Sequence, residues 1–326
     1  MGSKIKWGIL GPGGIAHSFA RGLSVIPDAE LIAAGSRSIE RASKFADEFD
    51  IPRRYGSYDE LVSDADIDAI YVSTVHPFHK DCAILALKAG KAVICEKPLA
   101  VNVAQVKEMI DCARNEGKFL MEAMWTRFIP VMVKAREWIA DGAIGEPRML
   151  TADFGFRAGI NPEGRLFNLD LAGGGLLDVG VYSIAMAYMI FGAPSTVTSA
   201  AHIGEMGVDE QAAMLFGYDE GQIALLSCAV RTNTPQEARI MGTDGSIYMP
   251  NFWHGTKATL QTNGKEPENV EFPFEGNGYE YEAMEVMKCI REGKLESDIM
   301  PLSESLSIME TMDSLRARWG LKYPMD

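Results

Sequence analysis

The sequence feature that most constrains the fold is the glycine-rich stretch from Gly11 to Ala16. It follows an apolar run of strand length and precedes an amphipathic helical pattern. A strand, a glycine turn and a helix in this order form a phosphate cradle, because the first turn of the helix offers unpaired N–H groups and the positive end of its dipole. The sequence therefore predicts a dinucleotide site formed by Gly11, Gly13, Gly14, Ile15 and Ala16. An ordinary glycine-rich strand-to-helix turn is the alternative.

The order of predicted elements divides the chain in two. Up to about residue 120, apolar runs of strand length alternate with helical patterns, which predicts right-handed βαβ crossovers and a doubly wound parallel sheet. After Pro130, short strands separated by turns predominate. We therefore predict a Rossmann domain over 1–122 and an α+β domain over 123–326 with a large, open, mostly antiparallel sheet. A helix predicted at about 303–319 could return to the first domain.

Charge and cysteine content exclude several classes of partner. The net charge is −14 with no basic run, which argues against nucleic acid and anionic membranes. The longest apolar run, Gly180–Phe191, is shorter than the roughly 18 residues of a membrane helix, and the opening Met1-Gly2-Ser3 carries no signal-peptide pattern. Scattered cysteines without a Cys-x-x-Cys pair favour reduced thiols over disulfides or zinc. We expect a cytoplasmic protein that binds a small molecule.

The residues after the second predicted strand indicate which dinucleotide binds. Sites that prefer NAD carry an acidic residue about 20 residues past the glycines, where it holds the ribose hydroxyls. This chain instead has Ser36 and Arg37, with Arg41 one helical turn further on. A hydroxyl and two guanidinium groups suit a 2′-phosphate, so we expect NADP as the cofactor, with NAD less favoured. A solvated arginine at a helix start is the structural alternative.

Two further segments contain residues suited to catalysis. Pro98 biases Lys97 away from helical geometry at the end of a predicted strand, so the ammonium group could project over the ligand. Asp178 and Tyr182 are four residues apart and would share one face of a helix. A neighbouring lysine would lower the tyrosine pKa from its usual value of about 10, and Asp178 could hold that lysine. Taken singly, a surface lysine and the polar edge of a core helix explain these residues equally well.

These motifs occur together in a known order. They are Gly11-x-Gly13-x-x-Ala16, Glu96-Lys97-Pro98, the block from Glu122 to Pro130, and Asp178-x-Gly180-x-Tyr182. Over essentially its whole length the chain resembles the glucose-fructose oxidoreductase / inositol dehydrogenase (Gfo/Idh/MocA) family, and within it the branch of dimeric dihydrodiol dehydrogenases and NADP-dependent D-xylose dehydrogenases. That branch has tyrosine where the inositol enzymes have histidine. Met186 stands where those enzymes carry an acid or amide, which excludes a histidine–aspartate relay.

The resemblance implies a reaction and a set of site residues. Hydride would move between NADP and a CH–OH group of a cyclic sugar or vicinal diol, with Lys97 and Tyr182 as the catalytic pair and Asp178 in support. The additional cofactor residues that it implies are Thr74, His76, His79, Glu96, Lys97, Trp125 and Arg127. The substrate residues that it implies are Lys97, Trp125, Phe154, Asp178, Tyr182 and Tyr279. For Trp125, Phe154 and Tyr279, packing in the hydrophobic core is the alternative role. The two histidines lack zinc-ligand spacing, so we expect no metal.

Three other expectations follow. The family commonly dimerises through the open face of the second-domain sheet, which Ala224, Leu226 and Cys228 would supply here. The triplet Gly173-Gly174-Gly175 indicates a mobile or close-packed segment near a ligand. An NAD-dependent glycoside hydrolase, a sugar oxidoreductase with a non-dissociating cofactor and a non-catalytic cofactor sensor remain alternative functions of the same fold.

Overall fold

The computed structural model describes residues 4–326, so the opening tripeptide, on which part of the targeting expectation depends, lies outside the described residues. The chain divides into two compact units. The first contains the residues up to Trp125 together with Phe274–Leu306, and the second contains Thr126–Pro273 and Ser307–Asp326. Residues 274–306, which the sequence analysis assigned to the second domain, therefore belong to the first unit.

The first unit contains a parallel sheet. Its strands are β1 (Ile5–Leu10), β2 (Ala29–Gly35), β3 (Arg53–Tyr55), β4 (Ala69–Val72), β5 (Ala92–Glu96) and β6 (Leu120–Ala123). Their order is β3-β2-β1-β4-β5-β6, and the chain reverses its direction of winding beside β1. This is the predicted doubly wound arrangement, in which ligands bind beyond the carboxyl ends of the strands at the reversal. β4 and β5 are buried along their whole length, as expected for strands covered on both faces.

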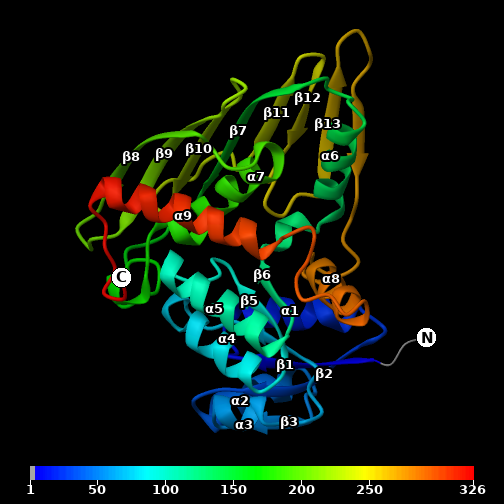
Figure 1. Ribbon diagram of the computed structural model, residues 1–326, viewed down its shortest axis with the longest axis vertical. Helices are drawn as coiled ribbons and strands as arrows, with labels where there is room; N and C mark the ends of the chain where they lie inside the picture. The colour runs from blue at the N-terminus through cyan, green and yellow to red at the C-terminus, as the bar shows by residue number, and fades with distance from the viewer. Residues whose placement is uncertain (1–3) are drawn as a thin grey trace. The chain divides into compact units, whose positions relative to one another are not determined.

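Helices cover this sheet. They are α1 (Gly14–Ser24), α2 (Ile39–Glu48), α3 (Tyr58–Val62), α4 (His79–Lys88), α5 (Val103–Glu116) and α8 (Glu280–Arg291), with a short 3-10 turn η1 (His76–Phe78). In Figure 1, α4 and α5 lie side by side on the sheet. Ala16 and Phe19 of α1 are fully buried, and the Phe19 ring stacks on Tyr71 of β4 at 3.8 Å. The alanine in the third motif position thus packs the helix against the sheet, as predicted.

The second unit contains a mixed sheet. Its strands are β7 (Pro147–Gly155), β8 (Thr196–Ile203), β9 (Asp209–Gly217), β10 (Ile223–Ala229), β11 (Ala238–Gly242), β12 (Gly245–Met249), β13 (Lys257–Thr262) and β14 (Glu268–Glu271). The order is β14-β13-β12-β11-β7-β10-β9-β8. β7 and β10 run parallel and the other neighbours run antiparallel, so the predicted mostly antiparallel sheet is confirmed.

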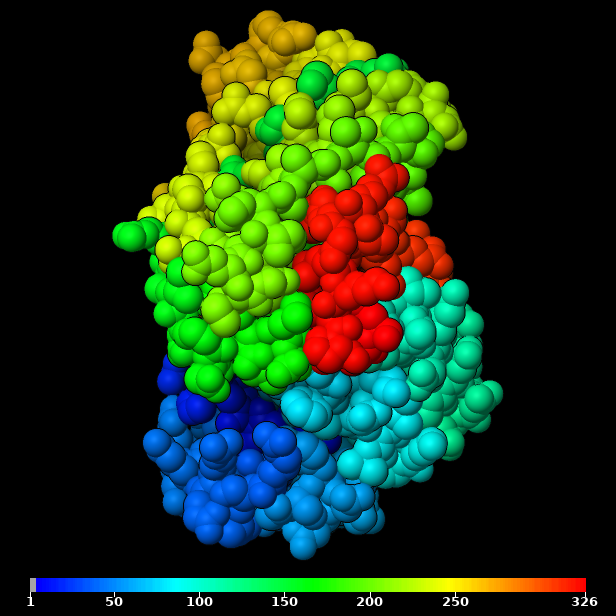
Figure 2. All heavy atoms as spheres, turned by 90° about the vertical axis from the view of Figure 1, so that its left-hand side faces the viewer, coloured from blue at the N-terminus to red at the C-terminus, as the bar shows by residue number. Residues whose placement is uncertain are grey.

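Helices also pack on this second sheet. They are α6 (Pro130–Ala140), α7 (Val181–Phe191) and the part of α9 (Leu302–Trp319) that begins at Ser307, with short 3-10 turns at η2 (Trp125–Arg127) and η3 (Leu169–Leu171) and a π turn, η4 (Leu176–Gly180), before α7. α7 packs against β7 and β10. The end of α9 lies beside β8, where the Trp319 indole donates to the Ser199 hydroxyl at 3.0 Å. Figure 2 shows this red segment against the light-green strands of the same unit.

Two expectations need correction. The first concerns the longest apolar segment. The helical stretch Leu169–Phe191 is longer than the apolar run identified in the sequence, and it has the length and composition of a membrane-crossing helix. Of its most apolar window, 83% is buried inside the protein, as in a core helix.

The second correction concerns the face of the sheet that was predicted to form the dimer. The three residues named for it are buried: Ala224, Leu226 and Cys228. The exposed large hydrophobic residues of that region are instead Ile223 (39%), Leu225 (44%), Leu215 (43%) and Met149 (38%), because neighbouring side chains of a strand alternate between its faces.

Candidate active site

The turn after β1 has the geometry of a phosphate cradle. Gly11 has a φ of +86°, and a Cβ there would lie 2.7 Å from Cγ2 of Thr74, so only glycine fits. Its amide donates to the Gly35 carbonyl at 3.0 Å, which fixes the turn to the end of β2. At Gly14 a Cβ would meet no described atom within 4 Å, and at Gly13 the nearest atoms lie 3.9 and 4.0 Å away. The space beside the helix start is therefore open to a phosphate group.

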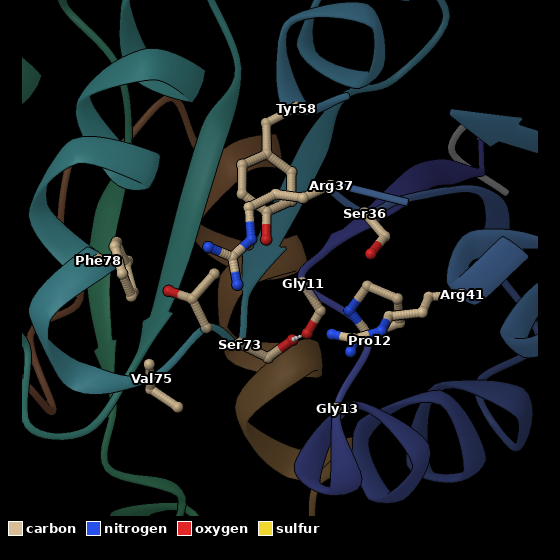
Figure 3. A pocket seen from close by; sticks show the side chains of 11 residues that line it. Gly11, Pro12, Gly13, Ser36, Arg37, Arg41, Tyr58, Ser73, Val75 and Phe78 are labelled. Atoms are coloured by element: carbon tan, nitrogen blue, oxygen red, sulfur yellow. Dashed lines mark hydrogen bonds between the residues drawn. The ribbon is translucent and has the colours of Figure 1, made fainter. Parts of the chain in front are cut away.

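A cavity of about 640 Å³, including space open to solvent, adjoins this turn (Figure 3). It is formed by the glycine turn, the end of β2, the first turns of α2 and α3, and the loop after β4. The lining residues are Gly11, Pro12, Gly13, Ser36, Arg37, Arg41, Tyr58, Ser73, Thr74, Val75 and Phe78. The structure thus brings the predicted cofactor residues of four segments into one pocket. The sequence analysis missed Tyr58 and Phe78, which belong to a short helix and a 3-10 turn that carry little periodic signal.

Arg37 and Arg41 give this pocket two exposed cations. The guanidinium carbon of Arg37 lies 5.4 Å from the centre of the Phe78 ring, and Figure 3 shows Arg41 beside Pro12. Burial raises the pKa of Tyr58, while the charges of Arg37 and Arg41 act in the opposite direction. The pocket therefore combines positive charge with aromatic and main-chain surfaces.

His79 connects this pocket to the loop that carries Lys97. The imidazole is fully buried, with Nδ1 2.9 Å from the Pro98 carbonyl oxygen and Nε2 2.9 Å from that of Thr74. Burial lowers the pKa of His79. The His76 ring lies 5.7 Å from it and is also buried. His79 thus links the loop after β4 to the loop that carries Lys97, and its predicted contact with a cofactor stays a prediction.

Glu96 is buried at the end of β5, where its carboxylate contacts other residues of the protein. One of its carboxylate oxygens accepts a short hydrogen bond from the Tyr71 hydroxyl, and the other accepts from the amide of Lys97 at 3.2 Å. Glu282 of α8, with no exposed surface, lies near the same carboxylate. Burial and the charge of Glu96 raise the pKa of Glu282 well above its usual value. Glu96 fixes the main chain at the predicted catalytic lysine.

Trp125 and Tyr279, two of the predicted substrate residues, meet in the first unit. Their rings stack with centres 4.5 Å apart and planes 11° from parallel. Gly278, at φ +98°, makes the approach possible, since a Cβ there would lie 2.7 Å from the indole. The Glu280 carboxylate accepts from the Gly278 amide at 2.7 Å and also from the two amides before it. The pair is therefore a rigid aromatic surface held by a turn of the main chain.

Arg127, predicted as a cofactor residue, lies in the second unit and is 3% exposed. Its guanidinium donates to the Ala185 carbonyl of α7 at 2.6 Å, and its own carbonyl accepts from Arg136 at 2.7 Å. These contacts tie the start of α6 to α7. Through these contacts Arg127 helps to hold α7, the helix that carries Tyr182, and its contact with a cofactor stays a prediction.

Tyr182 lies in the first turn of α7 among aromatic side chains. The centre of its ring is 5.4 Å from that of Phe154 and 6.3 Å from that of Trp253. Phe154 and Trp253 stack with centres 4.5 Å apart, and the Trp253 indole donates to the Gln236 side chain at 2.9 Å. Phe154 was among the predicted substrate residues. Trp253, in the loop after β12, was not. An isolated tryptophan in a loop gives no periodic pattern by which it could have been found.

Asp178 lies in the π turn, where the amide of Val181 bonds to the carbonyl of Leu176, five residues earlier. The expected regular helix is therefore wrong at this point, and the face that Asp178 shares with Tyr182 is not that of an α-helix. Asp178 is 5% exposed, and its carboxylate accepts from the Arg165 guanidinium at 2.8 Å. Arg165 was not among the predicted residues. Single-turn π segments occur frequently at functional sites.

The doubly wound sheet, the glycine turn and the charged pocket define an oxidoreductase with an NAD(P)-binding fold. Residues 5–124 match the family described as "Oxidoreductase family, NAD-binding Rossmann fold", and residues 132–248 match the GFO/IDH/MocA C-terminal domain. The chain belongs to the Gfo/Idh/MocA family, so the resemblance inferred from its motifs is confirmed.

Individual relatives agree with this assignment. Trans-1,2-dihydrobenzene-1,2-diol dehydrogenase of Mus musculus is 40% identical over 336 residues, which cover 99% of each chain. Among solved structures, aldose-aldose oxidoreductase from Caulobacter crescentus, complexed with glycerol, has a TM-score of 0.88 at 26% identity and matches 97% of this chain and 98% of its own. Levoglucosan dehydrogenase in complex with NADH has a TM-score of 0.89 at 20% identity, with 97% and 96% covered.

Proposed function

We propose that the protein is an NADP-dependent dehydrogenase that acts on a CH–OH group of a cyclic sugar or vicinal diol. The observation that carries the proposal is the match to a dihydrodiol dehydrogenase along 99% of both chains, together with the presence in this chain of Lys97 and Tyr182. Either a trans-dihydrodiol or a D-xylose type of substrate is consistent with these features.

The choice of NADP rests on the residues of the pocket. The fold alone does not select NADP, since levoglucosan dehydrogenase, which has a similar fold, was solved with NADH. Here Ser36, Arg37 and Arg41 line the pocket, and no acidic residue is among its lining residues in the described part of the chain. A 2′-phosphate would form charge-assisted hydrogen bonds with the guanidinium groups. The open space at Gly13 and Gly14 fits the pyrophosphate.

In the proposed reaction the bound nicotinamide supplies the hydride acceptor. Tyr182 accepts the proton of the alcohol as the carbinol carbon is oxidised to a carbonyl, and returns a proton in the reverse direction. A phenol with its usual pKa of about 10 is a poor base at neutral pH, so Lys97 is proposed to stabilise the phenolate and the substrate oxygen by its positive charge. Glu96 would hold the Lys97 main chain in place.

The aromatic side chains suggest how a ring-shaped substrate is held. Phe154 and Trp253 form a stacked pair beside Tyr182. Flat apolar surfaces of this kind suit the C–H face of a sugar or of a dihydrodiol ring. Asp178, held by Arg165, would supply a hydrogen-bond acceptor for a hydroxyl group.

The decisive test compares Lys97→Met and Tyr182→Phe with two controls, Lys88→Met on the exposed end of α4 and Tyr248→Phe on β12. Reduction of NADP+ is followed at 340 nm with a panel of aldoses, inositols and cyclic diols. We expect kcat to fall by about 10²–10⁴ in the two site variants and to remain unchanged in the controls, with NADP affinity preserved throughout. Full turnover in either site variant would refute the mechanism.

Sugar–sugar oxidoreduction is the second candidate, because an aldose-aldose oxidoreductase is among the similar solved structures. It differs from the first candidate in that the cofactor need not dissociate during turnover. Extensively dialysed protein that retains its nucleotide and reduces one aldose at the expense of another would favour it. Dialysed protein that is inactive until NADP+ is added would favour the simple dehydrogenase.

We also propose that the second-unit sheet binds a second copy of the chain. The register of the sheet places Met149 next to Ile223 and Leu215 next to Leu225, so the four exposed side chains form one apolar patch. Patches of this kind on soluble proteins mark interaction surfaces. Leu225→Lys should convert a dimer into a monomer in light-scattering measurements, whereas Ile160→Lys, in an exposed loop, should leave it intact. A wild-type monomer would contradict the proposal.

A further inference from the structure

We propose that Asp209 and Tyr323 are positioning residues that fix the turn Gly173-Gly174-Gly175, and through it Asp178 and Tyr182. The inference rests on the proposed function, in which Tyr182 exchanges a proton with the substrate. The turn leads directly into the π turn and then into α7. The two residues come from distant parts of the sequence, and neither belongs to a recognised motif of the chain.

Asp209 holds the amide side of the turn. This first residue of β9 has no exposed surface, and its Oδ2 accepts from the Leu176 amide at 2.6 Å. A Cβ on Gly174, whose φ is +118°, would lie 2.1 Å from Oδ1, so the carboxylate occupies the space that a side chain would need. Burial raises the pKa of Asp209 to about 7, although the amides of Leu176 and Gly175 act against that rise. A carboxyl group kept in such a site indicates a specific structural requirement.

Tyr323 holds the carbonyl side of the same turn. Its hydroxyl donates to the Gly173 carbonyl at 2.7 Å, and its side chain is 3% exposed. The ring is fixed by Arg316 of α9, whose guanidinium carbon lies 4.8 Å from its centre. Asp326 accepts from both Arg316, at 2.6 and 3.2 Å, and the Tyr323 amide, at 2.9 Å. The tyrosine is thus part of a rigid group.

The consequence for Tyr182 follows from the π turn. An i to i+5 hydrogen bond is less favourable than the α pattern and persists where surrounding contacts impose it. Asp209 and Tyr323 bond to the residues on either side of Gly174, so together they set where the π turn begins. Without them the segment could relax toward α-helical spacing, which would rotate Asp178 relative to Tyr182. Small displacements of a catalytic group reduce turnover more than they reduce binding.

The test uses Tyr323→Phe, Asp209→Asn and Asp209→Leu, with Tyr248→Phe as the matched control. The Tyr248 hydroxyl donates to Glu237 of the same unit at 2.8 Å and not to the turn. We expect Tyr323→Phe to lower kcat about 5–20-fold and Asp209→Leu to lower it further. Asp209→Asn, which keeps an oxygen for the Leu176 amide, should recover most of the lost turnover. NADP affinity should stay within about two-fold, since the cofactor pocket is in the first unit.

Turnover is counted per NADP-binding site, and the pH profile of kcat/KM and the midpoint of thermal unfolding are recorded with it. A merely structural role would lower the midpoint while leaving kcat per site and the pH profile as in the control, and that result would overturn the proposal. Tyr182→Phe is measured in parallel. If it stays active, the proposed function fails; if it is inactive while Tyr323→Phe matches the control, only the positioning role fails.

Discussion

The glycine-rich turns Gly11–Gly14 and Gly173–Gly175 both precede helices, and they use glycine for opposite reasons. In the turn Gly11–Gly14, the missing side chains of Gly13 and Gly14 leave space that is open to a ligand. In the turn Gly173–Gly175, the corresponding space at Gly174 is filled by the carboxylate of Asp209. The comparison teaches that a glycine cluster marks a close approach of the main chain to something, and that only the tertiary structure tells whether the neighbour is a ligand or the protein itself.

The largest expected effect that tests this comparison is that of Gly174→Ala. A methyl group would be forced against a buried carboxylate in a backbone conformation that alanine rarely adopts. We expect the free energy of unfolding to fall by more than about 3 kcal/mol, as measured by urea denaturation. A loss under about 1 kcal/mol would mean that the second turn is as open as the first.

The second prediction concerns pH. Burial raises the pKa of Asp209 from 3.8 to about 7, so the folded protein binds this proton more tightly than the unfolded chain. The favourable contribution of this proton to the free energy of unfolding is therefore complete below about pH 4, falls as the pH rises toward 7 and is absent above it; the difference is roughly 4 kcal/mol over the whole range and about 2–3 kcal/mol between pH 5 and 8. Denaturation of the wild type and Asp209→Asn between about pH 5 and 8 measures it. If the free energies of unfolding of the two proteins changed with pH in the same way, Asp209 would not be the group that titrates.

The third prediction addresses the pocket beside the first turn. Arg41→Ala and Arg37→Ala should each weaken NADP binding about 10–100-fold by removing a charge-assisted contact with the 2′-phosphate, while NAD binding changes little. Arg114→Ala, an exposed residue in the last turn of α5, is the control. Fluorescence titration with each cofactor gives the ratio of the dissociation constants for NADP and NAD. Equal losses for NADP and NAD would show that the arginines do not read the 2′-phosphate.

The smallest expected effect on stability is that of Gly14→Ala. Because a Cβ there meets no described atom within 4 Å, the free energy of unfolding should change by less than about 1 kcal/mol. Binding of NADP should nevertheless weaken, since the methyl group enters the space proposed for the phosphates. A destabilised protein with unchanged NADP affinity would reverse the comparison between the two turns.

Much of the first unit could be predicted from the sequence, because its elements are periodic and its turn chemistry is local. The strand, the glycine turn and the helix around Gly11 needed no distant residue to be identified. The short elements β3, α3 and β14 were missed, since segments of three to five residues contain too little periodicity. Tyr58 and Phe78 were missed with the local structure that carries them.

The structure of the second unit was harder to predict from the sequence, for physical reasons. β10 reads Ile-Ala-Leu-Leu-Ser-Cys-Ala and is apolar on both faces, so alternation could not reveal that Leu225 is exposed and Leu226 buried. The π turn depends on Asp209 and Tyr323, which are distant in the sequence. Arg165 was not identified because ion pairs across a long loop leave no pattern. A motif can identify a site residue by resemblance to a family, but the orientation of its side chain depends on packing against residues distant in the sequence.

The raised pKa of Glu282 has a thermodynamic consequence. Burial and the charge of Glu96 hold the pKa of this carboxyl group in the folded first unit well above its value in the unfolded chain, so the folded state binds the proton more tightly. Folding therefore takes up protons at pH values between the two pKa values. The heat of unfolding measured by calorimetry should accordingly depend on the ionisation enthalpy of the buffer, with a different value in phosphate than in Tris at the same pH, and Glu282→Gln should diminish that dependence.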